Sequence, residues 1–142
     1  MALKSLLFIV LCLFGVFAVK AQNVLGQPVS GTYEKKTVLE ILQDIETQTD
    51  VKFYFEPDDL PYYKLDESYD NVRLNEVLQD LCYGKNLVFS NFGDNRIVIT
   101  RKGDLTKEFA ERLIERWEAG EVVLPNIDEP EEVELTIGSV DN

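Results

Sequence analysis

The sequence predicts an α+β domain, in which a β-α-β unit is followed by a second copy extended to β-α-β-β, and then by a helix and an acidic tail. Three observations support this. The chain matches itself after a shift of 36 positions, which aligns Thr32 with Ser68 and Asp44 with Asp80. Within each copy the hydrophobic period changes from two residues to 3.6 and back. The length of 142 residues suits one ordinary domain.

Residues 1–21 have the features of a secretory signal peptide. A short basic start leads into an apolar run over residues 6–17, and Ala21 supplies the small side chain after which a signal peptidase cuts. The alternative is an uncleaved membrane anchor, but the apolar run is shorter than the roughly 20 residues that a spanning helix needs. We expect cleavage between Ala21 and Gln22 and export of the protein.

The first copy covers about residues 29–60. Its first strand alternates apolar and polar residues from Val29 to Tyr33. Thr37 and Glu40 have the spacing of a capping box, whose two side chains bind the first free backbone amides of a helix. The apolar residues of the helix recur at i, i+3, i+4 and i+7, and a half-buried strand follows them. These apolar residues are Val38, Ile41, Leu42 and Ile45 in the helix and Val51, Phe53 and Phe55 in the strand.

The second copy covers about residues 65–100 and begins its helix differently. Arg73 stands where the first copy has the capping residue Thr37, so we expect Asn71 to cap this helix. Gly84 provides a residue at which the helix can end. The apolar positions repeat those of the first copy: Leu65, Leu74, Val77, Leu78, Leu81, Leu87 and Phe89.

Two further elements follow the duplicated unit. Residues 93–95, Gly-Asp-Asn, tolerate positive φ and predict a hairpin between strands at 87–89 and 96–100. Residues 104–120 predict an amphipathic helix. We expect this helix to dock on the core, because an exposed stripe containing Trp117 would favour aggregation. The alternative is a spacer whose apolar stripe awaits a partner.

Charge and composition argue against several functions. The chain has 26 acidic and 14 basic residues and no histidine. It therefore lacks the imidazole of a Ser-His-Asp or Cys-His site and of His-ligated zinc, and its net charge of −12 argues against nucleic acid as a partner. Signal cleavage would leave Cys82 as the one cysteine, on an apolar helical stripe where it would be buried. We expect no enzyme activity, no metal and no cofactor.

Residues 121–142 form an acidic linker or tail in this interpretation. They contain no lysine or arginine and are interrupted by two prolines, so they offer little apolar surface to offset the entropy of ordering. Val133, Leu135 and Ile137 nevertheless alternate with polar residues. This alternation is typical of a strand, but the sequence shows no obvious partner for it.

The paired helices carry a resemblance to a known family. Residues 38–42 and 74–78 both have the form hydrophobe-x-Glu-hydrophobe-Leu, and each is followed by a strand at a matched distance. Residues 29–100 thereby resemble the secretin and TonB N-terminus short domain (STN), found at the periplasmic front of secretins and of TonB-dependent outer-membrane receptors. The resemblance implies two helices sandwiched between a two-stranded and a three-stranded sheet. It assigns residues 22–101 to an STN-like periplasmic domain.

The resemblance also implies a function. In transducer-type receptors this domain is a non-enzymatic signalling module, which contacts an inner-membrane anti-sigma regulator to report ligand uptake. The signal peptide looks like those of Bacteroidetes-type bacteria. We therefore expect a periplasmic protein associated with the outer membrane through downstream domains, as the front piece of a longer receptor. Its partner would be the regulator or the rest of the receptor.

Two kinds of surface could serve such a partner. A sheet with a free edge strand can pair with an extended peptide. The tyrosines Tyr54, Tyr62 and Tyr63 could line another contact, because tyrosine suits half-hydrated interfaces. Ordinary packing at the sheet margin is the alternative interpretation of these three residues.

Two other functions remain open from the sequence. One is a subdomain of a secretin-like outer-membrane ring. The other is a small hydrolase of envelope glycans that uses paired carboxylates, either Asp58 with Asp59 or Asp66 with Glu67. Neighbouring residues on a strand point to opposite faces, which places Asp66 and Glu67 poorly for joint catalysis.

Overall fold

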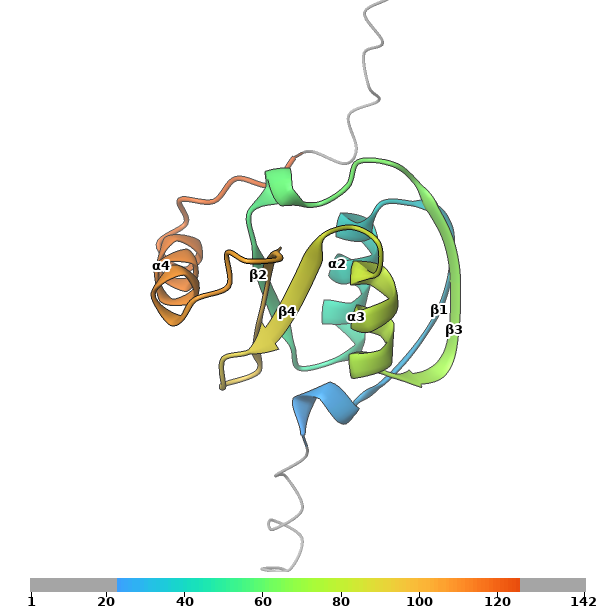
Figure 1. The fold of residues 1–142 in the computed structure, drawn as a ribbon. Helices are drawn as coiled ribbons and strands as arrows, with labels where there is room; N and C mark the ends of the chain where they lie inside the picture. The colour runs from blue at the N-terminus through green and yellow to red at the C-terminus, as the bar shows by residue number, and fades with distance from the viewer. Residues whose placement is uncertain (1–22, 126–142) are drawn as a thin grey trace, which may run out of the picture.

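The computed structural model describes residues 23–125, which form the predicted α+β fold (Figure 1). Helices α2 and α3 lie between a two-stranded sheet of order β1-β3 and a three-stranded sheet of order β2-β5-β4, and a further helix, α4, packs outside the larger sheet. The predicted sandwich is therefore confirmed. The elements are η2 (Val24–Gly26), β1 (Pro28–Lys36), α2 (Val38–Gln48), β2 (Lys52–Phe55), η3 (Pro57–Asp59), β3 (Leu65–Arg73), α3 (Leu74–Cys82), β4 (Leu87–Asn91), β5 (Arg96–Arg101) and α4 (Lys107–Glu118).

The smaller sheet is symmetric about the pair Thr32 and Ser68. β1 and β3 are antiparallel, and these two residues lie opposite each other. On either side of them Gly31 pairs with Tyr69 and Tyr33 pairs with Glu67. Since a shift of 36 positions turns one of these pairs into the other, the two copies of the repeat are related here by an approximate twofold axis.

The larger sheet has the same symmetry around its central strand, β5. Tyr54 of β2 and Ser90 of β4 both lie opposite Val98, one on each side of it. Tyr54 and Ser90 are also 36 residues apart. β2 runs parallel to β5 and β4 runs antiparallel to it, so β2 and β4 occupy equivalent edges in opposite directions.

The main core lies between the two sheets and is built from the apolar positions that the periodicity predicted. Alternate residues of the larger sheet face α2 and α3, as the period of two requires. The helices contribute their i, i+3, i+4 and i+7 stripes. Fully buried members of this core include Val29, Ile41, Leu42, Ile45, Phe53, Leu74, Leu78, Leu81 and Ile97.

The capping box predicted for α2 is confirmed, whereas the cap predicted for α3 is wrong. Thr37 Oγ1 accepts a hydrogen bond from the Glu40 amide at 3.3 Å, and the Glu40 carboxylate accepts one from the Thr37 amide at 2.8 Å. Asn71 does not cap α3, because helix α3 begins after Arg73, whose side chain makes no capping bond. The Leu74 amide instead donates to the backbone carbonyl of Gln27 at 2.8 Å.

Asn71 has a different task, in an irregularity of β3. Its φ of 52° is in the left-handed region, which asparagine tolerates better than most residues. It lies where the register between β1 and β3 shifts, and its amide donates to Ser30 Oγ at 2.8 Å. The local bulge therefore uses the residue that the sequence pattern offered as a cap.

The predicted third helix, 104–120, is observed as the shorter α4 (Lys107–Glu118) and is docked. Ala110, Leu113 and Ile114 pack on Tyr54 and Val98 on the outer face of the larger sheet. At the end of the helix, the Trp117 indole donates to the Phe55 carbonyl at 2.8 Å. Docking is thus confirmed over the spacer alternative.

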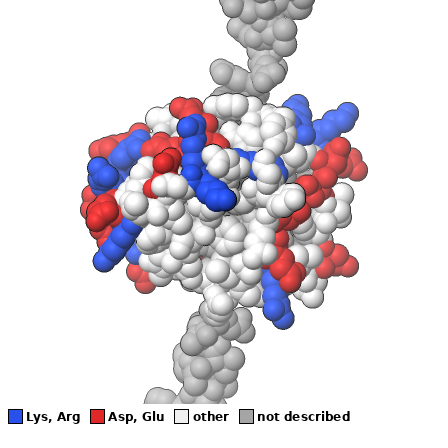
Figure 2. Space-filling model, viewed as in Figure 1, with Lys and Arg blue, Asp and Glu red and all other residues white. Residues whose placement is uncertain are grey.

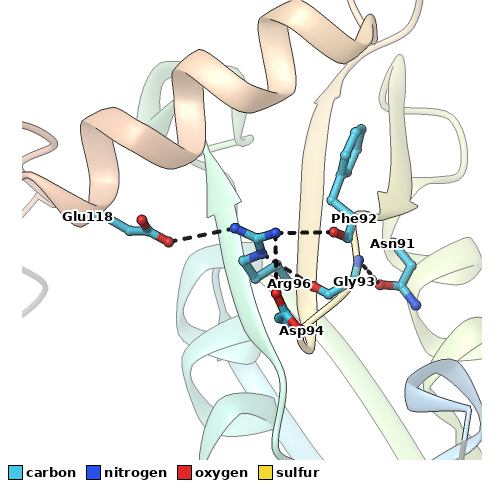
Figure 3. A network of polar contacts seen from close by, with 6 residues as sticks. All are labelled: Asn91, Phe92, Gly93, Asp94, Arg96 and Glu118. Carbon is cyan, nitrogen blue, oxygen red and sulfur yellow. Dashed lines mark hydrogen bonds and ion pairs between the residues drawn. The ribbon is translucent and has the colours of Figure 1, made fainter.

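Arg96 fastens the hairpin between β4 and β5 to the end of α4 (Figure 3). Gly93, Asp94 and Asn95 all have positive φ, as predicted for this turn. The guanidinium donates to the carbonyls of Phe92 and Gly93 and lies 3.8 Å from the Glu118 carboxylate. The Arg96 side chain therefore contacts both the hairpin turn and the end of α4.

Some predictions fall outside or at the margin of this description. The predicted signal peptide, 1–21, with its cleavage point at Ala21 and Gln22, and most of the predicted tail, 121–142, lie outside the described residues. Cys82 is buried as predicted, and burial raises the pKa of its thiol to about 11. A thiol with so high a pKa is a weak nucleophile at neutral pH.

Candidate interaction surface

The three tyrosines proposed as a contact do not form one cluster. Tyr54 is only 4% exposed, because α4 covers it and its ring packs in a T-shaped pair with Trp117 at a centroid distance of 5.9 Å. Tyr62 and Tyr63 are 70% and 55% exposed. Tyr54 therefore belongs to the packing between α4 and the sheet, while the other two face solvent.

Two exposed apolar residues were missed by the sequence analysis. Tyr83 is 84% exposed and Val123 is 82% exposed. Tyr83 follows the last residue of α3 and stands directly before Gly84. Its place just after the apolar stripe of the helix is a sequence signal for its exposure. Val123 lies beyond α4, where the sequence offered no periodic signal.

The topology brings these exposed residues to one end of the domain (Figure 1). β2 and β5 are parallel, so loop 56–64 leaves the sheet at the end where β5 stops. β4 is antiparallel to β5 and starts at the same end, after loop 83–86. Segment 119–125 runs from α4 to η3 at this end. We call these three segments the tyrosine end; they carry the exposed residues Tyr62, Tyr63, Tyr83 and Val123.

Loop 56–64 is held in place although its tyrosines are exposed. Leu60 is buried in the main core. The Asp59 carboxylate lies 2.8 Å from the Arg101 guanidinium, and Arg116 of α4 pairs with Glu56. Burial raises the pKa of Asp59, and the positive charge of Arg101 opposes this shift. A loop anchored over residues 56–60, next to its tyrosines, presents their side chains with less ordering left to occur on binding.

The acidic pairs considered for glycan hydrolysis have separate structural partners. Asp58 accepts a hydrogen bond from the Tyr62 hydroxyl, and Asp59 is paired with Arg101. Asp66 accepts one from the Lys35 amide at 2.9 Å. Within residues 23–125, no group of three or more acidic or cysteine side chains is placed to hold a metal ion.

A second polar region lies beside the smaller sheet and shows the repeat most directly. The Tyr33 hydroxyl donates to Asp44 at 2.5 Å, and the Tyr69 hydroxyl donates to Asp80 at 2.6 Å. Burial, followed by the hydrogen bond to Asp44, raises the pKa of Tyr33 to about 12. Burial, followed by the hydrogen bond to Asp80, likewise raises the pKa of Tyr69. An open hollow of about 540 Å³ lies beside Tyr33. Among the polar side chains that line it, Tyr33 and Asp44 bind each other, and Glu40 binds the capping residue Thr37.

One edge of the larger sheet is guarded. On the free side of β2, the Phe53 amide donates to the Glu46 carboxylate at 3.0 Å, and the Phe55 carbonyl accepts from the Trp117 indole at 2.8 Å. Burial raises the pKa of Glu46, and the bond from the Phe53 amide opposes the shift. Two main-chain groups that an added strand would need are thus occupied by side chains, so β2 is a poor acceptor for an extended peptide.

Comparison with known proteins leaves the family open: no family model matches this chain, and no curated protein matches it in sequence. Among residues 23–125, no helix has the length and apolarity needed to cross a bilayer. The function is therefore inferred from the surface of the domain.

Proposed function

We propose that this protein is a non-enzymatic signalling or interaction domain of the periplasm, similar to the N-terminal domain of TonB-dependent receptors. In this proposal it contacts an anti-sigma regulator and reports ligand uptake through the rest of a receptor. The observation that carries the proposal is the tyrosine end. The large apolar side chains that are exposed within residues 23–125 all belong to the three segments at this end, of which loop 56–64 is anchored.

The chemistry of the tyrosine end favours a protein partner. Exposed apolar side chains that are scattered singly over a surface need no explanation, whereas a group of them marks an interaction site. Tyrosine offers a large apolar ring and a polar hydroxyl, and it is enriched among residues that dominate binding energy. The exposed fractions of Tyr62 and Tyr83, 70% and 84%, leave most of each side chain available for contact.

The charge of the protein constrains the partner. The full chain carries 26 acidic and 14 basic residues. Figure 2 shows acidic side chains along both flanks of the face that carries β4. Electrostatic complementarity therefore favours a partner whose contacting surface is neutral or basic. This agrees with a protein ligand and gives no support to nucleic acid.

The proposed location rests on the sequence pattern of residues 1–21 and belongs to the same proposal. A signal peptide over residues 1–21, cut between Ala21 and Gln22, would export the chain. Outer-membrane association would come from further domains of a receptor. The residues of the tyrosine end all lie within residues 23–125, so the proposed contact can be measured on the exported chain.

The test is a binding measurement between residues 22–142 and the periplasmic part of an anti-sigma regulator encoded beside this gene. We expect saturable binding by calorimetry. Changing Tyr62, Tyr63 and Tyr83 together to serine should weaken binding by about tenfold or more, the usual effect of losing aromatic anchors. The corresponding triple change to phenylalanine should keep most of the affinity, because it keeps the rings.

A matched control lies at the opposite end of the domain. Asp50 is exposed just before β2 begins, so Asp50→Ser should leave binding unchanged. Absence of binding by the unmodified chain to every regulator encoded nearby would overturn the proposed partner. Equal affinity of the serine triple variant and the unmodified chain would overturn the tyrosine end as the contact.

A further inference from the structure

The larger sheet has a second edge, β4, which is open in the described structure. In an antiparallel pair, alternate residues turn their N–H and C=O groups toward the partner strand. The bonds from the Lys102 amide to the Asn86 carbonyl and from the Phe92 amide to the Arg96 carbonyl show which residues face β5. By that alternation Val88 and Ser90 also face β5. Leu87, Phe89 and Asn91 therefore present their main-chain groups to the free side.

Nothing in β4 protects this edge. Natural edge strands are guarded by charged side chains, by proline, by bulges or by a covering element. The residues of β4 are Leu-Val-Phe-Ser-Asn, without charge or proline, and their register with β5 is regular over all five positions. Figure 2 shows a largely uncharged surface over the lower part of β4. The equivalent edge on β2 is blocked by Glu46 and Trp117. Of the two edges related by the twofold axis, one is therefore blocked and the other is open.

The same chain contains a segment with the pattern of a missing strand. Residues 133–137, Val-Glu-Leu-Thr-Ile, alternate apolar and polar side chains and include three β-branched residues. Five residues match the five of β4. The segment contains no proline, and the helices and strands described within residues 23–125 offer it no other open edge on the larger sheet.

The described chain ends close enough to β4 for this pairing. Segment 119–125 reaches η3, at the end of the domain where β4 begins (Figure 1). The seven residues 126–132 can span roughly 23–25 Å when extended. A domain of about 100 residues has a radius of gyration of about 13 Å. The connection is therefore comparable in length with the dimensions of the domain, and it starts at the end where β4 begins.

Charge favours the same placement. Lys85 and Lys102 stand beside the start of β4, and neither makes an ion pair within residues 23–125. The segment that would arrive is acidic on its polar side and at its start, with Glu131, Glu132 and Glu134. Attraction between these lysines and glutamates would help to bring the segment to the start of β4, although exposed ion pairs add little stability.

We propose that residues 133–137 add to the free edge of β4 as a fourth strand of the larger sheet, within the same chain. The sheet order becomes β2-β5-β4 followed by this strand. The added strand covers the uncharged free edge of β4. The inference rests on the edge and the tail pattern alone and holds whether or not the protein binds a regulator.

Amide hydrogen exchange, read by NMR on residues 22–142, tests the proposal. The Phe89 amide points to the free edge, so it should be protected in the unmodified chain. It should exchange about tenfold faster or more in Leu135→Pro, which removes a donor and breaks the added strand. The Ser90 amide, bonded to β5, should not change. Ile127→Asp places a disruptive residue in the same tail outside the segment, and it should leave the Phe89 amide protected.

The outcomes separate the possible occupants of the edge. Equal exchange of the Phe89 amide in the unmodified chain and in Leu135→Pro would overturn the proposal. Protection that disappears on dilution would also overturn it, because it would assign the edge to a second copy of the chain. Nuclear Overhauser contacts between Phe89 and residues 133–137 that persist on dilution would support it directly.

Discussion

Thr32 Oγ1 and Ser68 Oγ lie 3.4 Å apart at the centre of the smaller sheet, and the two residues are equivalent in the duplicated sequence. A residue meets its own counterpart only where a twofold axis passes. Val98 marks the same axis in the larger sheet, where Tyr54 and Ser90 flank it. The internal repeat is therefore expressed as a symmetric core, whose two helices are enclosed by sheets to which both copies contribute.

The symmetry predicts equal effects of removing the two equivalent hydroxyls. Tyr33→Phe and Tyr69→Phe each delete a hydrogen bond to a carboxylate, with Asp44 and Asp80 respectively. Each change should lower the free energy of unfolding by about 1–2 kcal/mol, because a buried tyrosine loses its hydrogen bond to a charged acceptor. Urea denaturation of each variant provides the measurement. Tyr83→Phe, at an exposed position, is the control and should leave the unfolding midpoint in place.

The helix starts break the symmetry, which gives a second prediction. Thr37→Ala removes the side chain of a capping box and should cost about 1 kcal/mol of unfolding free energy. Arg73→Ala, at the equivalent position, should cost much less, because the Leu74 amide is bound by the Gln27 carbonyl. Thermal unfolding monitored by circular dichroism would compare the two. Equal losses would contradict the assignment of the α3 cap to the backbone.

This difference shows why some features were predictable and others were not. Local signals carried the repeat, the two periods of hydrophobicity and the Thr37–Glu40 box, since each depends on residues close in sequence. The cap of α3 comes from Gln27, which is far away along the chain, and no local pattern could indicate it. The burial of Tyr54 likewise depends on where α4 docks.

The exposed residues of the candidate surface divide in the same way. Tyr62 and Tyr63 follow a proline in a loop that composition alone identifies. Tyr83 and Val123 join them because parallel β2 and β5 end together and α4 returns its chain to η3. These segments come to the same end because of the topology. The topology depends on contacts between residues far apart along the chain, which local sequence patterns do not indicate.

The docking of α4 predicts that the helix is part of the folding unit. Trp117 packs against Phe55 at a centroid distance of 5.0 Å and also donates to its carbonyl. Trp117→Ala should lower the free energy of unfolding by about 2–3 kcal/mol, less than for a fully buried tryptophan because Trp117 is only partly buried. Glu115→Ala, on the exposed side of α4, is the matched control. Guanidinium denaturation of both variants would contradict the docking if the two midpoints coincided.

The Glu67 carboxyl gives a prediction about pH. Burial raises its pKa above the usual 4.5, and the neighbouring Asp80 carboxylate adds to the shift. A carboxyl with a raised pKa holds its proton more tightly in the folded state than in the unfolded one, so ionisation of Glu67 destabilises the fold as pH rises through that pKa. Glu67→Gln removes this penalty. The variant should therefore match the unmodified chain well below pH 4.5 and gain stability over it as the pH approaches neutrality.

The comparison requires unfolding free energies of both proteins across the acidic range. Glu34→Gln is the control, since Glu34 is an exposed residue of β1 and its replacement should shift stability little at any pH. Glu67→Gln should give a smaller gain in stability when it is added to Asp80→Asn than when it is made in the unmodified chain. This result would identify Asp80 as a source of the penalty, because removing either charge relieves the same repulsion. An advantage of Glu67→Gln that is constant over the whole pH range would contradict an ionisation effect and would assign it to packing.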